Sequence, residues 1–200
     1  MYVMYGFGIL YAAVDPTPDP MLAVAAVIGA YLVATASRSA GRRDGIAGRF
    51  EHSAFALILV CLALSLAFLW LAAASPTGRF YGHGPATLMP NIVFASLGAG
   101  FDLAFILRGR LTGSQRIARH VWRISVAMLM VTFSTFAGDQ IQKVFPDAIR
   151  GSFLLVLPAV AVLLAMVYWL VRLRFGRGMR RRAQKPERNA ATLAPSRSTA

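Results

Sequence analysis

Long apolar stretches alternate along this chain with loops that are, in turn, rich and poor in Lys and Arg. The complete apolar stretches cover residues 21–36, 53–74, 88–107, 121–137 and 153–171. Each is close to the ~20 residues that a helix needs to cross the hydrocarbon core of a bilayer. The sequence therefore predicts an all-α fold, a polytopic transmembrane helical bundle with about five complete spans.

The first apolar stretch, residues 1–14, is too short to be a complete span, because a helix of that length covers only about 21 Å. It ends in Asp15-Pro16-Thr17-Pro18-Asp19-Pro20, a turn-forming sequence that cannot continue a helix. We expect residues 1–14 to form a partial N-terminal membrane helix, the last half of a span whose beginning is not in this sequence. Residues 15–173 form the predicted transmembrane domain.

Composition excludes several classes of protein. Hydrophobic residues make up 57% of the chain and the mean hydropathy is +0.58, which is too apolar for a soluble domain. The net charge of +13 is compatible with nucleic-acid binding, but the arginines lie in short loops and one tail and form no basic face, so no nucleic-acid partner is predicted. The single cysteine, Cys61, lies inside an apolar stretch and cannot form an internal disulfide.

The basic residues predict the orientation in the membrane. Successive loops contain four, one, four and two Lys or Arg residues, and the tail after Val171 contains nine. Because cytoplasmic loops carry the excess of Lys and Arg, the rich loops and the tail are predicted to be inside. This predicts a multi-pass protein of the bacterial inner membrane with a cytoplasmic C-terminus, and places the loops at 75–87 and 138–152 outside.

The C-terminal tail, residues 174–200, mixes arginine with Gly, Ala, Pro and Ser and has little apolar content. We expect it to be disordered. The basic residues at 177–182 follow a span directly, so they are expected to attract anionic lipid headgroups by roughly 1 kcal/mol per charge. The predicted partners are therefore the lipid bilayer and its anionic headgroups.

Asp102 is a charged residue inside the apolar stretch 88–107. A charge at the centre of a span costs on the order of 2.5–3.5 kcal/mol, so such a residue usually faces the bundle interior and has a partner. Arg123 and His120, near the start of the next stretch, are the candidate partners. The Asp102–Arg123 pair is interpreted as a buried polar pair that fixes helix register, and a proton or cation site remains the functional alternative.

Two histidines, His52 and His120, open stretches on the predicted cytoplasmic side. Two imidazoles at one depth on different helices are candidate axial ligands of haem b. With Glu51 they are also candidates for another metal site, although they form no local metal-binding motif, and no metal is predicted. His83 lies between glycines in an outer loop and is expected to be solvated.

Small residues and prolines predict details of the packing. Ser96 and Gly100 are four residues apart, a spacing that lets two helix backbones approach closely. Pro90 is expected in a first helical turn, where proline is tolerated. Pro158 is expected to kink the last span, with its freed carbonyl satisfied by neighbouring helices.

One segment resembles a group of uncharacterised bacterial multi-pass membrane proteins. The matching residues are Arg116-Ile-Ala-Arg119-His120-Val-Trp122-Arg123 with the later Lys143-Val-Phe145-Pro146, preceded by Gly100-Phe-Asp102, Arg108-Gly, Leu111-Thr-Gly and Arg42-Arg43-Asp44-Gly45. The resemblance covers the chain from about Ala30 to Arg174. It implies further membrane helices before residue 1 and directs attention to Asp102, His120 and Arg123, but it implies no reaction.

The sequence contains no phosphate-binding Gly-rich loop, nucleophile elbow, zinc-protease helix or CxxC motif. It therefore predicts a non-enzymatic integral membrane protein of unknown biochemical role, a candidate small transport or assembly component. The alternatives are a haem-binding membrane redox protein that uses His52 and His120, and a proton-coupled carrier centred on Asp102.

Overall fold

The computed structural model describes residues 2–14, 19–41, 46–111, 113–137 and 153–192, with the side chains of the last helix described as far as Arg174. Within these ranges the chain is helical, and its β-structure is limited to two isolated bridges. The all-α fold is therefore confirmed for the described residues. The elements are α1 (Tyr2–Val14), α2 (Pro20–Gly41), α3 (Arg49–Ala74), α4 (Pro85–Arg108), α5 (Gly113–Ala137), the 3₁₀ turn η1 (Phe153–Leu155) and α7 (Leu157–Thr192).

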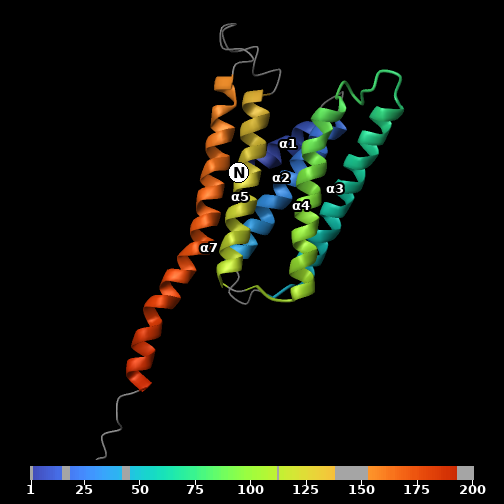
Figure 1. The fold of residues 1–200 in the computed structure, drawn as a ribbon. Coiled ribbons are helices and arrows are strands. Elements are labelled where there is room, and N and C mark those ends of the chain that lie inside the picture. The colour runs from blue at the N-terminus through green and yellow to red at the C-terminus, as the bar shows by residue number, and fades with distance from the viewer. Residues whose placement is uncertain (1, 15–18, 42–45, 112, 138–152, 193–200) are drawn as a thin grey trace, which may run out of the picture.

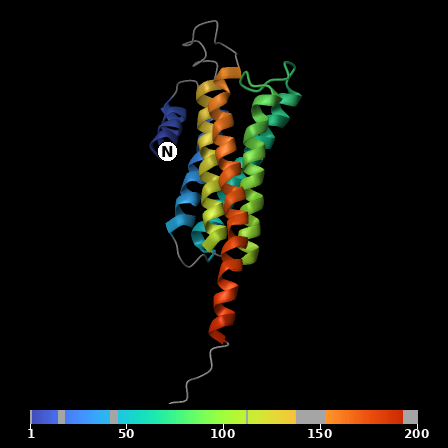
Figure 2. The same cartoon turned by 60° about the vertical axis from the view of Figure 1, so that its left-hand side comes forward.

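The helices form two antiparallel pairs on either side of a central helix (Figure 1). α3 and α4 make one pair, and α5 and α7 make the other. α2 lies between the pairs and packs against α1, α3, α4 and α5. The short helix α1 lies at the edge of the bundle, as the turned view shows (Figure 2).

The core is centred on α2 because this helix has neighbours on most sides. Ile28 and Leu32 of α2 are completely buried, and they pack in one cluster with Ile58 of α3 and Ala127 of α5. By contrast, much of α3 and α7 presents large apolar side chains outward. An outward apolar surface over helices of this length is what a bilayer requires of a bundle.

Among the described residues, four helices are long and apolar enough to cross a membrane: α2, α3, α4 and residues 157–174 of α7. The predicted count of about five complete spans is not confirmed. The difference lies in α5, which is helical over Gly113–Ala137 but is not among the four. The side chains of its last residues, 133–137, lie outside the described residues, and the described part contains Arg116, Arg119 and Arg123. α1 has 13 residues.

Both proline predictions were wrong. Pro90 lies inside α4, and it is Pro85 that occupies the first turn of that helix. Pro158 is the second residue of α7, a position where proline lacks only a donor that would be unpaired anyway, so it begins the helix instead of kinking it. The chain reaches this helix through the 3₁₀ turn η1.

The last helix continues to Thr192, whereas the sequence predicts a disordered tail from about residue 174. Adding residues to an existing helix costs less than starting one, and Arg and Ala are good helix formers. The predicted outer loop at 138–152, the Arg42-Arg43-Asp44-Gly45 segment and residues 193–200 lie outside the described residues.

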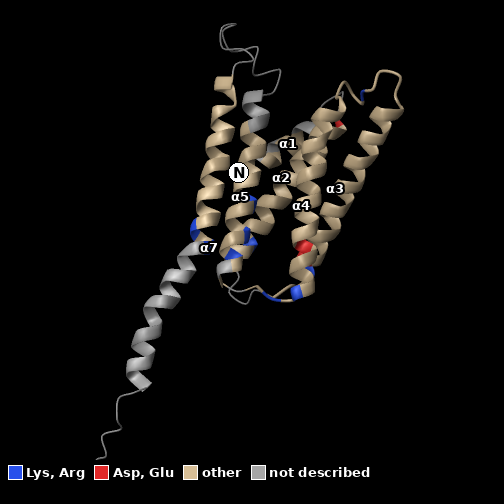
Figure 3. Cartoon of the chain, in the orientation of Figure 1, with Lys and Arg blue, Asp and Glu red and all other residues tan. Residues whose placement is uncertain are grey.

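Most of the described arginines gather at one end of the bundle, where α4 ends and α5 begins (Figure 3). Two chain segments are joined at this end, since Ala47 N–H donates to the Gly109 carbonyl (3.2 Å) and Ile46 bridges to Arg110. Gly109 ends α4 with a φ of 67°, a conformation that glycine adopts without strain. The loops that precede α3 and follow α4 therefore lie together.

Candidate functional site

Asp102 belongs to the buried face of α4. This face also contains Ala95, Gly98, Ala99 and Phe105, which follow the three- and four-residue spacing of one side of a helix. Only 1% of the Asp102 residue surface is exposed. Its carboxylate is therefore directed into the bundle and away from the apolar exterior.

The small residue that matters in α4 is Gly98, not the predicted pair Ser96 and Gly100. A methyl group at Gly98 would lie 3.2 Å from Cε1 of Tyr31 and 3.3 Å from Cγ1 of Ile58, whereas one at Gly100 would meet no described atom within 4 Å. Two residues along a helix correspond to a turn of about 200°, so Gly98 and Gly100 point to opposite sides. Gly98 provides the space in which Tyr31 reaches Asp102.

Three side chains from two other helices donate hydrogen bonds to the Asp102 carboxylate. On α5, Nη2 of both Arg119 (2.5 Å) and Arg123 donates to the same oxygen, Oδ1. On α2, the Tyr31 hydroxyl donates to the other oxygen, Oδ2. Asp102 therefore links α4 to both α2 and α5, and both of its oxygens are engaged.

The two guanidinium groups are also packed against aromatic rings. Cζ of Arg119 lies 4.3 Å from the centre of the Phe105 ring, and Cζ of Arg123 lies 5.2 Å from the centre of the Tyr31 ring. Both distances are within the range of cation–π attraction. Arg123 is completely buried, so its charge is held by Asp102 and by rings instead of by solvent.

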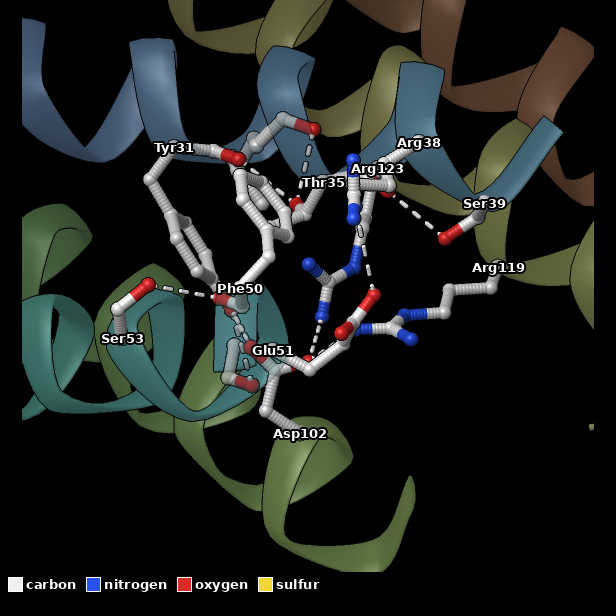
Figure 4. A network of polar contacts seen from close by, with 12 residues as sticks. Tyr31, Thr35, Arg38, Ser39, Phe50, Glu51, Ser53, Asp102, Arg119 and Arg123 are labelled. Atoms are coloured by element: carbon white, nitrogen blue, oxygen red, sulfur yellow. Dashed lines mark hydrogen bonds and ion pairs between the residues drawn. The ribbon is translucent and has the colours of Figure 1, made fainter. Parts of the chain in front are cut away.

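A second acid, Glu51, lies beside these groups at the start of α3 (Figure 4). Its Oε2 accepts a hydrogen bond from Gly48 N–H (2.8 Å), which completes a capping box, and its Oε1 is 3.7 Å from Nε of Arg38. Glu51 is buried, while the Arg38 side chain is 43% exposed. We refer to Arg38, Glu51, Asp102, Arg119 and Arg123 as the charged cluster.

The charged cluster carries more positive than negative charge. Among the described residues, the two buried arginines of α5, Arg119 and Arg123, share the single carboxylate of Asp102, which leaves one positive charge in excess there. Placing charged groups out of water is costly unless they are paired and hydrogen-bonded. The excess positive charge is therefore expected to lower the stability of the protein unless another group compensates it.

The two candidate haem ligands, His120 and His52, each contact a backbone carbonyl through Nδ1. Nδ1 of His120 is 3.0 Å from the Ala36 carbonyl of α2, so His120 is not a partner of Asp102. Nδ1 of His52, an exposed residue, is 2.8 Å from the Gly48 carbonyl at the start of its own helix. Each histidine thus keeps Nε2 as the nitrogen that could bind a metal. No group of three or more His, Cys, Asp or Glu side chains suited to a metal ion occurs in the described part of the chain.

The third histidine, His83, is predicted to be solvated, but in the structure it is partly buried and has a charged partner. Nε2 of His83 lies 2.6 Å from Oδ2 of Asp19, and the side chain is 26% exposed. The same aspartate accepts a hydrogen bond from Met21 N–H through Oδ1 (2.9 Å), at the beginning of α2. His83 therefore ties the loop between α3 and α4 to the N-terminus of α2.

The structure brings together Asp102 and Arg123, the two residues proposed as a pair, and adds three that sequence reasoning missed. The sequence places Arg119 in a loop before the stretch 121–137, Glu51 beside His52, and Tyr31 inside the uncharged stretch 21–36. The repeat of Arg119 and Arg123 at four residues was a usable signal, because such residues share a helix face. Tyr31 gives a weaker signal, as the one tyrosine in the stretch 21–36.

Comparison with protein-family models, with curated proteins and with solved structures found no match for this chain. Inference about its function therefore starts from the charged cluster and from the helices that hold it.

Proposed function

We propose that this chain is a non-enzymatic integral protein of the bacterial inner membrane, a small transport component with the charged cluster at its centre. Four helices of spanning length and composition support a membrane location. In this proposal α5 crosses the membrane as well, through residues 121–137, because α2 and α7 pack along it. Neighbouring helices shield the charged first half of α5 from lipid.

The arrangement of the loops supports an orientation with the charged cluster on the cytoplasmic side. The loops before α3 and after α4 lie together through the Ala47–Gly109 hydrogen bond, and these are two of the arginine-rich segments. Excess Lys and Arg mark the cytoplasmic side. The C-terminus is cytoplasmic in the same orientation.

The observation that carries the proposal is the burial of Asp102, Arg119 and Arg123 at one contact between α4 and α5. Ionisable groups within a helical bundle in a membrane are expensive and usually mark the path of a charged substrate. A carrier that used Asp102 for protons would have to protonate a carboxylate that holds two guanidinium groups. The geometry therefore favours a transported or bound ion over a transported proton.

Orientation is tested by fusing reporters to the chain. A reporter that is active only in the cytoplasm, fused after Ala200, is expected to be active, and a reporter active only outside is expected to work in the loop at 75–84. Activity of the outer reporter after Ala200 would overturn the orientation.

Transport is tested in liposomes that contain the purified chain. Concentration jumps of inorganic phosphate, acetate and potassium are applied while the membrane current is recorded, for the original chain and for Asp102→Asn. We expect a current with at least one of these ions that Asp102→Asn abolishes while the helical content is unchanged. Asp19→Asn, at the opposite end of α2, is the matched control and should keep the current. Absence of current with all three ions, or equal currents in Asp102→Asn, would count against a transport role.

A further inference from the structure

The two buried arginines hold hydrogen-bond donors that no described residue uses. Nε and Nη1 of Arg123 and Nε of Arg119 are buried and have no hydrogen-bond partner among the described residues. A guanidinium group has five N–H bonds, and all of them donate. Buried donors without acceptors are unfavourable, and more so when they carry charge. These three nitrogens therefore call for an acceptor that the described residues do not provide.

Asp102 cannot satisfy all three nitrogens, because a carboxylate has about four acceptor sites and three of them are already used. Oδ1 receives Arg119 and Arg123, and Oδ2 receives Tyr31. Arg119 and Arg123 together carry one more charge than Asp102, counted over the described residues that contact them. The missing acceptor is therefore expected to be an anion with a single negative charge.

We propose that Arg119 and Arg123 form a binding site for a phosphate group. Guanidinium groups pair with phosphate through several charge-assisted hydrogen bonds at once, and the available donors come from two guanidinium groups fixed on one carboxylate oxygen. This site rests on the proposed role of the charged cluster and specifies its ligand. The phosphate belongs either to a lipid headgroup or to free inorganic phosphate.

The position of the cluster gives the phosphate a route of entry. Arg119 is the more accessible of the two arginines, with 12% of its side chain exposed, while Arg123 lies behind it at 0%. Their partner Asp102 lies six residues before the end of α4 at Arg108, and both arginines belong to the first half of α5, so the site is close to the end of the bundle at which α4 finishes. A phosphodiester carries one negative charge, which equals the excess in the charged cluster.

The test uses the full chain, purified in neutral detergent and freed of lipid. Binding of phosphatidylglycerol and of phosphatidylcholine is counted by native mass spectrometry, and binding of inorganic phosphate is measured by titration calorimetry. All measurements are made in high salt, which screens exposed arginines more than buried ones. Arg119→Lys keeps the charge opposite Asp102 but removes the guanidinium donors. Arg49→Lys, an exposed arginine at the start of α3, is the matched control.

We expect saturable binding of one phosphate-bearing probe, weakened about tenfold in Arg119→Lys and unchanged in Arg49→Lys, because the guanidinium group donates more hydrogen bonds to phosphate than an ammonium group does. Binding of phosphatidylglycerol but not of phosphatidylcholine identifies an anionic lipid headgroup. Binding of inorganic phosphate without phosphatidylglycerol identifies free phosphate. Saturable binding of neither probe, or equal binding in Arg119→Lys, overturns the site.

A measurement on the unmodified chain covers the case in which Arg119→Lys fails to fold. Inorganic phosphate should displace bound phosphatidylglycerol when chloride is replaced at equal ionic strength, and failure of both probes to bind overturns the site without any variant. The liposome currents separate this inference from the transport proposal. Currents without phosphate binding would overturn the site alone, and phosphate binding without currents would overturn the transport role alone.

Discussion

Asp102 of α4 and Arg123 of α5 form an ion pair whose side chains are 2% and 0% exposed, respectively. The ion pair connects α4, which is paired with α3, to α5, which is paired with α7. Because a buried charge is tolerable only with its partner, neither residue is replaceable on its own. The energetic coupling between them is accessible to measurement.

Asp102→Asn is expected to lower the free energy of unfolding by roughly 3–5 kcal/mol, since it leaves buried guanidinium groups without their carboxylate. Adding Arg123→Gln should restore part of this loss, because the most deeply buried unpaired charge is then gone. Equilibrium unfolding of the single and double variants in mixed micelles of mild detergent and dodecyl sulfate gives the coupling energy. Additive effects of the two substitutions would show that the pair is not coupled.

The space beside Tyr31 should be sensitive to side chains at Gly98 but not at Gly100. A methyl group at Gly98 is already within 3.2 Å of Tyr31 and 3.3 Å of Ile58, whereas the other position is open. Gly98→Val is expected to be less stable than Gly100→Val by about 1–3 kcal/mol, the usual cost of overpacking a core. The two variants have the same change in helix propensity, so thermal unfolding of the pair isolates the contact. Equal melting temperatures would contradict the packing described here.

The contact between α1 and α2 depends on Gly29, over which the ring of Tyr5 lies. A methyl group at Gly29 would overlap Cε1 of the Tyr5 ring. Gly29→Ala should therefore expel the ring and break the hydrogen bond from the Tyr5 hydroxyl to the Ala127 carbonyl (2.7 Å). Tyr5→Phe removes only that bond and should cost roughly 0.5–1.5 kcal/mol. We expect Gly29→Ala to be the more destabilising in a chemical unfolding experiment. Gly6→Ala, where the added methyl meets no described atom within 4 Å, serves as the control.

Haem binding is tested by the oxidised-minus-reduced absorption spectrum of the purified chain. His120 is part-buried and its Nδ1 is held at the Ala36 carbonyl of α2, whereas His52 is exposed at the start of α3, so the two imidazoles do not share one enclosed site. We therefore expect no Soret band. A Soret band that disappears in His120→Ala or His52→Ala would support the redox alternative instead.

The helical architecture was largely predictable because apolar length and loop charge act locally. The stretch 53–74, for example, is uncharged throughout and lies within α3, which begins a few residues earlier at Arg49 with its capping residues. α5 was harder, because the arginines at its start look like loop residues until their partner on another helix is known. The apolar stretch 121–137 predicts only the later part of α5, because the charged residues before it have no apolar pattern.

The pairing of Asp102 with Arg123 was predictable from the cost of a charge in a span, which requires a partner at a similar depth. The contributions of Tyr31 and Glu51 were not, because both depend on which faces of α2 and α3 meet α4 and α5. Asp19 and His83 illustrate the same limit. They are 64 residues apart, and only the folded chain brings their side chains within 2.6 Å.

The hydrogen bond from Tyr5 to Ala127 also has a consequence for the order in which the protein is built. The two residues are separated by 122 positions, so α1 leaves the ribosome long before its acceptor has been synthesised. At ordinary rates of translation this interval is on the order of ten seconds. During that time α1 can rest on Gly29 of α2 but cannot complete its attachment. The attachment of α1 is thus completed only after α5 has been synthesised.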